Sequence, residues 1–332
     1  MADNQTSEVA DPQAIVVGVD GSNASRNALR FAIGEAKALG RSIRVVGAYT
    51  VPSVAAATID VSYVPIDDSA VRASVTTVLK EAAAEVKAAD VAVEAIIEIG
   101  DAAGVLVEES KQAGLTVVGS RGKGGFAGRL LGTVSSALPA HSACPTIVVP
   151  VGWTPDAARE ARPSSSRPVH SSTHGPVERS EETDTVPGVD YSGQVVVGVD
   201  SLGKDSPALW EAADIAVRRS SPLHIQAVIT TTVIGPEWIP SQGDLERLIK
   251  EGTDKLEAAR AALIEKHPDL EVRWTLFDGQ PAEVLVRASD TCDILVLGSR
   301  GRGGFAGLLL GSTSQSVLPY SAAPTMVVRV KR

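Results

Sequence analysis

Short apolar runs alternate with amphipathic stretches along most of the chain. Residues 15–19 and 43–48 are apolar runs, which predict strands buried on both faces of a sheet. Between them, apolar residues recur at helical spacing over 29–39, and Gly40 marks the predicted end of that helix. The first half continues with helices predicted over 71–86, 105–110 and 134–141, and with strands over 91–99, 115–119 and 146–151. This alternation predicts a doubly wound parallel sheet.

The second half of the chain repeats the first. The opening apolar run returns, as AIVVGVD from Ala14 and as VVVGVD from Val195. A glycine-rich stretch also returns, as GSRGKGGFAGRLLGTVS from Gly119 and as GSRGRGGFAGLLLGSTS from Gly298. The period is that of a whole domain. The predicted fold class is therefore α/β, with two repeated, Rossmann-like, doubly wound domains of five parallel strands each.

The segment between the copies has a different composition. Residues 153–192 are rich in Ser, Thr, Pro and charged residues and contain few large aliphatic side chains. Such a segment buries too little apolar surface to order itself, so we predict a flexible linker. The predicted domains are residues 10–152 and 193–332.

Composition narrows the class of protein. The chain has 332 residues, of which 44% are hydrophobic and only 4% aromatic, so the cores are expected to be aliphatic. The net charge of −9 argues against a nucleic-acid partner, and no apolar run approaches the roughly 20 residues that span a membrane. The polar, acidic start lacks the pattern of a signal peptide, and Cys144 and Cys292 occupy unrelated positions in the two copies. We therefore expect a cytoplasmic protein without disulfides.

The glycine-rich stretch carries the candidate chemistry. In doubly wound sheets ligands bind beyond the carboxyl ends of the strands, and this stretch follows a predicted strand there. Glycines let backbone N–H groups approach an anion, and the predicted helix start at Gly132 offers unsatisfied N–H groups to phosphate. Positive charge and hydroxyl groups come from Arg121, Lys123, Arg129, Thr133 and Ser135. Because both copies retain the same glycines, a ligand site is favoured over a surface loop that needs glycines only for its turns.

Two other phosphate motifs do not fit. The segment GVDSLGKD, from Gly198, matches a Walker A loop except that Asp205 replaces the hydroxyl residue that binds magnesium. A dinucleotide fingerprint G-x-G-x-x-G would follow the first predicted strand, and the segment GVDGSN found there, from Gly18, does not fit it.

Each half resembles a universal stress protein domain. Nucleotide-binding members of that family share G-x-x-G, nine residues, then G-[ST]. Both copies match this spacing, at Gly119, Gly122 and Gly132-Thr133, and at Gly298, Gly301 and Gly311-Ser312. The resemblance implies a tandem universal stress protein with an adenine nucleotide alpha hydrolase-like fold, binding ATP, with Mg²⁺ as counterion.

The resemblance also implies roles for particular residues. Asp20 and Asp200 would accept a hydrogen bond from the adenine amino group, although an Asp after a strand also serves as a turn or helix cap. The backbone near Ala48 and Val228 would complete the adenine contacts. The full set of candidate binding residues in the first half is Asp20, Gly21, Ser22, Ala48, Val118, Gly119, Arg121, Gly122, Gly132, Thr133, Val134 and Ser135. In the second half it is Asp200, Ser201, Val228, Leu297, Gly298, Arg300, Gly301, Gly311, Ser312, Thr313 and Ser314.

An enzyme is the less favoured hypothesis. The glycine stretches hold no carboxylate or histidine that would orient water at a γ-phosphate, and no metal-ligating cluster stands out. We expect a nucleotide-dependent stress-response sensor or regulator, without catalytic residues. Cyclic AMP in place of ATP, slow ATP hydrolysis, a nucleotide-transferring enzyme and a structural protein without ligand remain as alternatives.

The two domains are expected to pack on each other. By resemblance to family dimers, the contact edges would be the last strand of each copy, 146–151 and 325–330, related by a pseudo-two-fold axis. Whether two chains also form a homodimer is left open.

Overall fold

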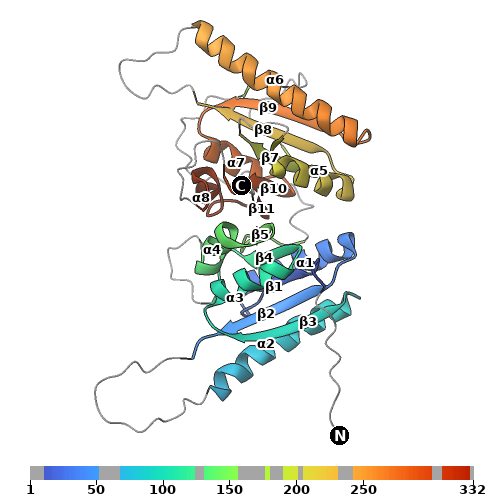
Figure 1. Cartoon of the computed structure of the whole chain (residues 1–332), viewed down its shortest axis with the longest axis vertical. Coiled ribbons are helices and arrows are strands. Elements are labelled where there is room, and N and C mark those ends of the chain that lie inside the picture. The colour runs from blue at the N-terminus through green and yellow to red at the C-terminus, as the bar shows by residue number, and fades with distance from the viewer. Residues whose placement is uncertain are drawn as a thin grey trace, which may run out of the picture.

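The computed structural model describes residues 11–51, 68–123, 131–155, 176–179, 190–200, 205–230, 242–300 and 309–329. Within these residues the strands form one 11-stranded sheet in the order β3-β2-β1-β4-β5-β11-β10-β7-β8-β9-β6. Figure 1 shows the first half of the chain at one end of this sheet and the second half at the other.

The first half is a doubly wound domain. Its elements are β1 (Ile15–Gly18), α1 (Asn23–Leu39), β2 (Ile43–Tyr49), α2 (Ser69–Ala88), β3 (Val93–Ile99), α3 (Ala102–Glu109), η1 (Ser110–Gln112), β4 (Leu115–Gly119), α4 (Thr133–His141) and β5 (Thr146–Val149). All strand pairs within the domain are parallel. The central neighbours β1 and β4 bring together the ends of the first strand and of the strand that precedes the glycine-rich stretch, as predicted.

The second half repeats this order. Its elements are β7 (Val195–Val199), α5 (Pro207–Arg219), β8 (Leu223–Ile229), α6 (Gln242–Lys266), β9 (Val272–Asp278), α7 (Pro281–Ser289), β10 (Ile294–Gly298), α8 (Ser312–Val317) and β11 (Thr325–Val328). Its five repeat-related strands are parallel too, in the mirrored order β11-β10-β7-β8-β9. The predicted fold class is confirmed. The near-continuous apolar strands of the sequence are the buried centres of both domains.

The two domains join through their last strands. β5 and β11 pair antiparallel, with Met326 opposite Ile147, so the predicted contact edges are confirmed. A second contact joins α1 to α5, where the Arg219 guanidinium donates a hydrogen bond to the buried Glu35 carboxylate. Arg219 also lies over the Phe31 ring, 5.7 Å from its centroid. The domains therefore share a hydrophobic interior and an ion pair.

Three parts of the predicted linker contact the domains. β6 (Pro176–Arg179) lies inside it and pairs antiparallel with β9 at the end of the sheet. Trp153 is buried and packs edge-on against Phe31, with ring centroids 5.3 Å apart. Tyr191 is buried against His224 at a centroid distance of 4.8 Å. Single aromatic side chains and one edge strand thus anchor parts of a polar segment. The linker residues 156–175 and 180–189 lie outside the described residues.

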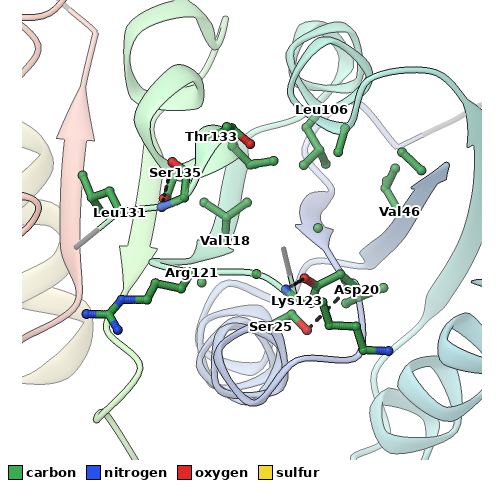
Figure 2. A pocket seen from close by; sticks show the side chains of 18 residues that line it. Asp20, Ser25, Val46, Leu106, Val118, Arg121, Lys123, Leu131, Thr133 and Ser135 are labelled. Atoms are coloured by element: carbon green, nitrogen blue, oxygen red, sulfur yellow. Dashed lines mark hydrogen bonds between the residues drawn. The ribbon is translucent and has the colours of Figure 1, made fainter. Parts of the chain in front are cut away.

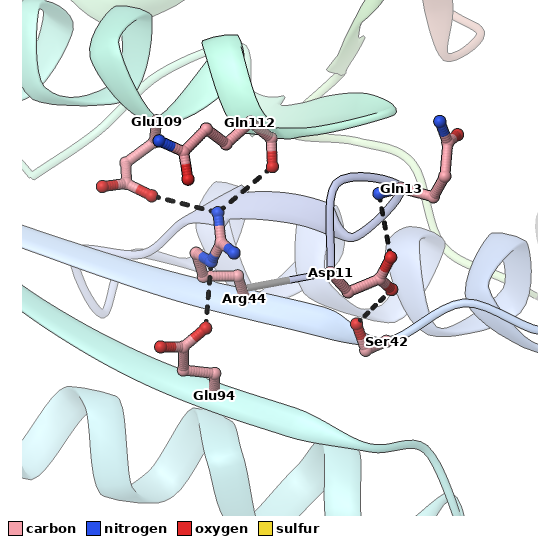
Figure 3. Close-up of polar contacts among 7 residues, drawn as sticks. All are labelled: Asp11, Gln13, Ser42, Arg44, Glu94, Glu109 and Gln112. Carbon is pink, nitrogen blue, oxygen red and sulfur yellow. Dashed lines mark hydrogen bonds and ion pairs between the residues drawn. The ribbon is translucent and has the colours of Figure 1, made fainter. Parts of the chain in front are cut away.

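A buried arginine fastens the outer strands of the first domain. Arg44 of β2 lies almost completely out of solvent, and its Nε donates to Glu94 of β3 at 3.0 Å. Its Nη1 donates to Glu109 and to the Gln112 carbonyl, both at 3.3 Å (Figure 3). One side chain therefore ties β2 to β3 and to the end of α3, at the opposite end of β2 from Ala48.

Candidate functional site

A cavity of about 270 Å³ opens at the carboxyl ends of β1, β2 and β4 in the first domain. Figure 2 shows it from close by. Ten of the predicted binding residues line it: Asp20, Ala48, Val118, Gly119, Arg121, Gly122, Gly132, Thr133, Val134 and Ser135. These residues come from four separate elements, and the doubly wound topology gathers them at one edge of the sheet.

Two predicted residues lie beside the cavity and shape the chain there. Gly21 has a φ of +78°, a backbone conformation that favours glycine. Ser22 is the N-cap of α1, because its hydroxyl accepts a hydrogen bond from the Ser25 N–H at 3.2 Å. Both residues therefore serve the turn between β1 and α1.

Eight lining residues were not in the predicted set of binding residues, although Lys123 was considered as a source of positive charge. They are Gly18, Val19, Ser25, Val46, Ala102, Leu106, Lys123 and Leu131. Val46 and Leu106, with the predicted Val118, give the cavity an apolar wall (Figure 2). Strand alternation was a usable signal for Val46, because it lies two residues before Ala48 on β2. No comparable signal marked Leu106, which reaches the site from α3.

Asp20 ties two edges of the cavity together. Its Oδ1 accepts from the Ser22 N–H at 2.9 Å, and its Oδ2 accepts from the Lys123 N–H at 2.7 Å. The carboxylate therefore acts as a turn cap and holds the start of the glycine-rich stretch against the end of β1. A carboxylate oxygen has a second lone pair, so these bonds leave Asp20 able to accept from a ligand.

The pKa of Asp20 lies below its ordinary value. Burial by itself raises the pKa, but the hydrogen bonds from Ser22, from the Lys123 N–H and from Ser25 together outweigh burial and lower it. A carboxyl group with a depressed folded pKa stabilises the fold above its unfolded pKa. That stabilisation is lost as the pH falls through the folded value.

We predict that Asp20→Asn lowers the free energy of unfolding at neutral pH, because the amide oxygen can accept only one of the two backbone N–H groups and the amide nitrogen can accept neither. The difference from wild type should narrow as the pH falls through the folded pKa of Asp20, which lies below the ordinary value; urea unfolding at neutral pH and over an acidic pH series measures both effects. Asp101→Asn is the matched control, because Asp101 caps α3 at an exposed position and asparagine caps equally well. Equal losses in both variants at neutral pH would contradict this role of Asp20.

The three glycines of the predicted phosphate cradle have different reasons to be glycine. A Cβ on Gly119 would lie 2.6 Å from the Ala24 backbone, and one on Gly122 would lie 2.5 Å from Asp20 Oδ2. These two positions are therefore fixed by contacts inside the protein. A Cβ on Gly132 would have Arg121 Cα and Ser135 Oγ as its nearest neighbours, both at 3.6 Å, so packing among the described residues does not demand glycine there.

The start of α4 faces the cavity with unpaired donors. Gly132 is the N-cap, and Thr133, Val134 and Ser135 form the first helical turn. No acceptor for the N–H groups of these three residues is found in the described part of the chain, as expected for a helix N-terminus. The Ser135 hydroxyl, in contrast, is engaged: it accepts from the Gly132 N–H at 3.0 Å and donates to the Ser120 carbonyl at 2.8 Å. Ser135 therefore fastens the loop, and its backbone is the part available to a ligand.

The cations of the glycine-rich stretch point in different directions. Figure 2 shows the Arg121 side chain running away from Val46 and Leu106. The Lys123 ammonium lies beside Gly21, 3.1 Å from where a Cβ of that glycine would be. Arg129 and residues 124–128 lie outside the described residues, as do residues 303–307 of the second copy.

The second domain brings its predicted residues to the equivalent edge. Asp200 follows β7, Val228 lies near the end of β8, and Leu297, Gly298 and Arg300 lie at the end of β10. Gly311, Ser312, Thr313 and Ser314 begin α8, and the Gly311 N–H donates to Ser299 as the Gly132 N–H does to Ser120. Ser201 and Gly301 lie outside the described residues.

Neither a metal cluster nor a membrane span is found in the described residues. No group of three or more His, Cys, Asp or Glu side chains there is placed to hold a metal ion. None of the helices that the structure describes has the length and hydropathy to cross a bilayer.

Fold and cavity define a class of protein: tandem doubly wound α/β domains with a ligand-sized cavity at the carboxyl ends of the strands. The sequence model of the universal stress protein family matches residues 12–150 and 192–329, which is most of the chain. The chain belongs to the universal stress protein family, and the predicted resemblance is confirmed.

Known relatives share the tandem organisation. One universal stress protein of Mycobacterium tuberculosis is 29% identical over 341 residues, covering 95% of each chain. A second from the same organism is 29% identical over 332 residues, covering 95% of this chain and 96% of the relative. The crystal structure of a universal stress protein from Archaeoglobus fulgidus aligns with a TM-score of 0.59 at 23% identity, covering 96% of this chain and 97% of that one. That likeness supports the fold.

Proposed function

We propose that the chain binds ATP and acts as a nucleotide-dependent regulator of a stress response. The observation that carries this proposal is the cavity of the first domain, which combines an apolar wall with the open N-terminus of α4. Anions bind at such termini because free N–H groups and the helix dipole both favour negative charge. Gly132 adds support, since it is the N-cap of this helix and lines the cavity.

The cavity has separate places for a base and for phosphates. Val46, Leu106 and Val118 offer apolar surface to a flat ring, with Asp20 within the same lining as a hydrogen-bond acceptor. The backbone of Gly132 and Thr133 would hold phosphate oxygens, whereas the Lys123 ammonium lies beside Gly21, at the turn between β1 and α1. Mg²⁺ would accompany the triphosphate and neutralise part of its charge. The chain's own contribution is backbone N–H groups and shape.

We propose regulation through binding in place of catalysis. Asp20 is the one carboxylate in the described lining of the cavity, and both its oxygens already accept backbone N–H bonds. Its depressed pKa makes it a weak general base. Any hydrolysis of ATP should therefore be slow. The cytoplasm, which supplies ATP, is the compartment that suits this function.

Native mass spectrometry identifies the ligand. The full chain would be mixed with ATP, ADP, AMP and cyclic AMP in equal amounts, with Mg²⁺ present. We expect ATP adducts to dominate, with up to two per chain. If cyclic AMP adducts dominate, the ligand is cyclic AMP and the proposal of ATP is wrong. The absence of any adduct would contradict nucleotide binding altogether.

A further inference from the structure

One buried carboxamide in the second domain has no partner. Gln226 lies on β8 between Gly198 of β7 and Thr275 of β9, and its side chain is 1% exposed. Neither its Oε1 nor its Nε2 makes a hydrogen bond within the described residues. A buried amide without a partner costs free energy, so this side chain is costly to the protein in the absence of a ligand.

The position of Gln226 is equivalent to that of Val46 in the first domain. Gly18 pairs with Val46, and Gly198 pairs with Gln226 in the same parallel register. The neighbourhoods match as well: a Cβ on Gly18 would lie 2.7 Å from Leu106, and one on Gly198 would lie 2.8 Å from Leu285. Since Val46 lines the cavity of the first domain, Gln226 occupies the corresponding wall in the second.

The rest of that wall stays apolar in both copies. Leu285 corresponds to Leu106, and Leu297 corresponds to Val118, both being buried. The nearby His224 and Thr275 bond to each other, with 3.0 Å between Nε2 and Oγ1. The carboxamide is therefore the one change of chemistry among these corresponding wall residues, and it brings a donor and an acceptor.

We propose that Gln226 is a specificity-determining residue of a second nucleotide site, where its carboxamide hydrogen-bonds the edge of the purine base. Glutamine recognises adenine in this way elsewhere, pairing with a ring nitrogen and the exocyclic amine. This inference rests on the proposed ATP binding. It predicts two unequal sites: the first domain holds the base by apolar contact at Val46, and the second adds a direct hydrogen bond to the base.

Gln226→Met keeps the side-chain volume and removes both hydrogen-bonding atoms, and Gln226→Val reproduces the first domain. We expect either change to lower the affinity of the second-domain site for ATP by about tenfold, which is the order of one buried hydrogen bond. The affinity of the first-domain site should be unaffected, and calorimetry measures both. Val46→Met is the matched control in the first domain, and it should leave the affinity of the second-domain site for ATP unchanged. Without nucleotide, both Gln226 variants should unfold at a higher temperature than wild type, because the unpartnered amide is gone.

The outcomes separate this inference from the function on which it rests. Two ATP sites in wild type that both survive Gln226→Met unchanged would overturn the role of Gln226 and leave ATP binding standing. A lower unfolding temperature of nucleotide-free Gln226→Met and Gln226→Val would also overturn it, because it would show a structural partner for the amide. No ATP binding by wild type would overturn the proposed function and this inference together.

Discussion

Gly132→Val is expected to weaken ATP binding in the first domain by about a hundredfold while changing the free energy of unfolding by less than about 1 kcal/mol. The backbone of Gly132, with φ −80° and ψ 170°, suits any residue. A Cβ there would lie in ordinary van der Waals contact with Arg121 Cα and Ser135 Oγ, both at 3.6 Å, so we expect the fold to accept a side chain at this position. The same side chain would stand where phosphate must approach the α4 N–H groups. Calorimetry with ATP and urea unfolding measure the two effects.

Gly34→Ala is the control for this prediction. Gly34 lies on the exposed side of α1, and a Cβ there has no neighbour within 4 Å. Alanine should stabilise the helix by up to about 1 kcal/mol and leave ATP binding unchanged. Gly122→Ala should behave differently from both, losing stability as well as affinity, because its Cβ would press on Asp20 Oδ2. Full ATP affinity in Gly132→Val would contradict the proposed phosphate position.

Arg219→Ala is expected to lower the free energy of unfolding by about 3 kcal/mol. Arg219 of α5 pairs with Glu35 of α1, whose side chain is only 6% exposed, and this pair joins the two domains. Removing the guanidinium leaves a nearly buried carboxylate without its partner, which is the costly case for an ion pair. Urea unfolding at neutral pH measures the loss.

Arg30→Ala is the matched control for the interdomain pair. Arg30 bonds Glu85 with both side chains well exposed, at 49% and 38%, so its loss should cost less than about 1 kcal/mol. The double variant Arg219→Met with Glu35→Gln should recover part of the stability, because the unpaired charge is then removed as well. Similar losses in Arg219→Ala and Arg30→Ala would show that the pair does little to hold the domains together.

Much of the fold follows from the sequence because its signals are local. Continuous apolar runs such as residues 15–19 form the buried strands. Because the sequence is repeated, the same pattern can be recognised in both copies. β6 and the buried Trp153 and Tyr191 were missed because one short edge strand and isolated aromatics depend on contacts far along the chain. The average composition of a polar segment does not reveal such long-range contacts.

The position of the candidate site was predictable from the sequence, but part of its lining was not. The spacing of Gly119, Gly122 and Gly132 located the cavity, but the reasons for the first two differ from a phosphate cradle, since they admit Ala24 and Asp20. Val46 and Leu106 were missed because their place in the wall depends on strand register and on the packing of α3. The retained residues 124–128 lie outside the described part of the chain.

The measurement that tests the central claim most directly is a calorimetric titration of ATP into the full wild-type chain in the presence of Mg²⁺. The account predicts a saturable heat of binding and up to two ATP per chain, with the first-domain site removed by Gly132→Val. The absence of saturable binding of ATP, ADP, AMP and cyclic AMP to a folded wild-type chain would contradict it.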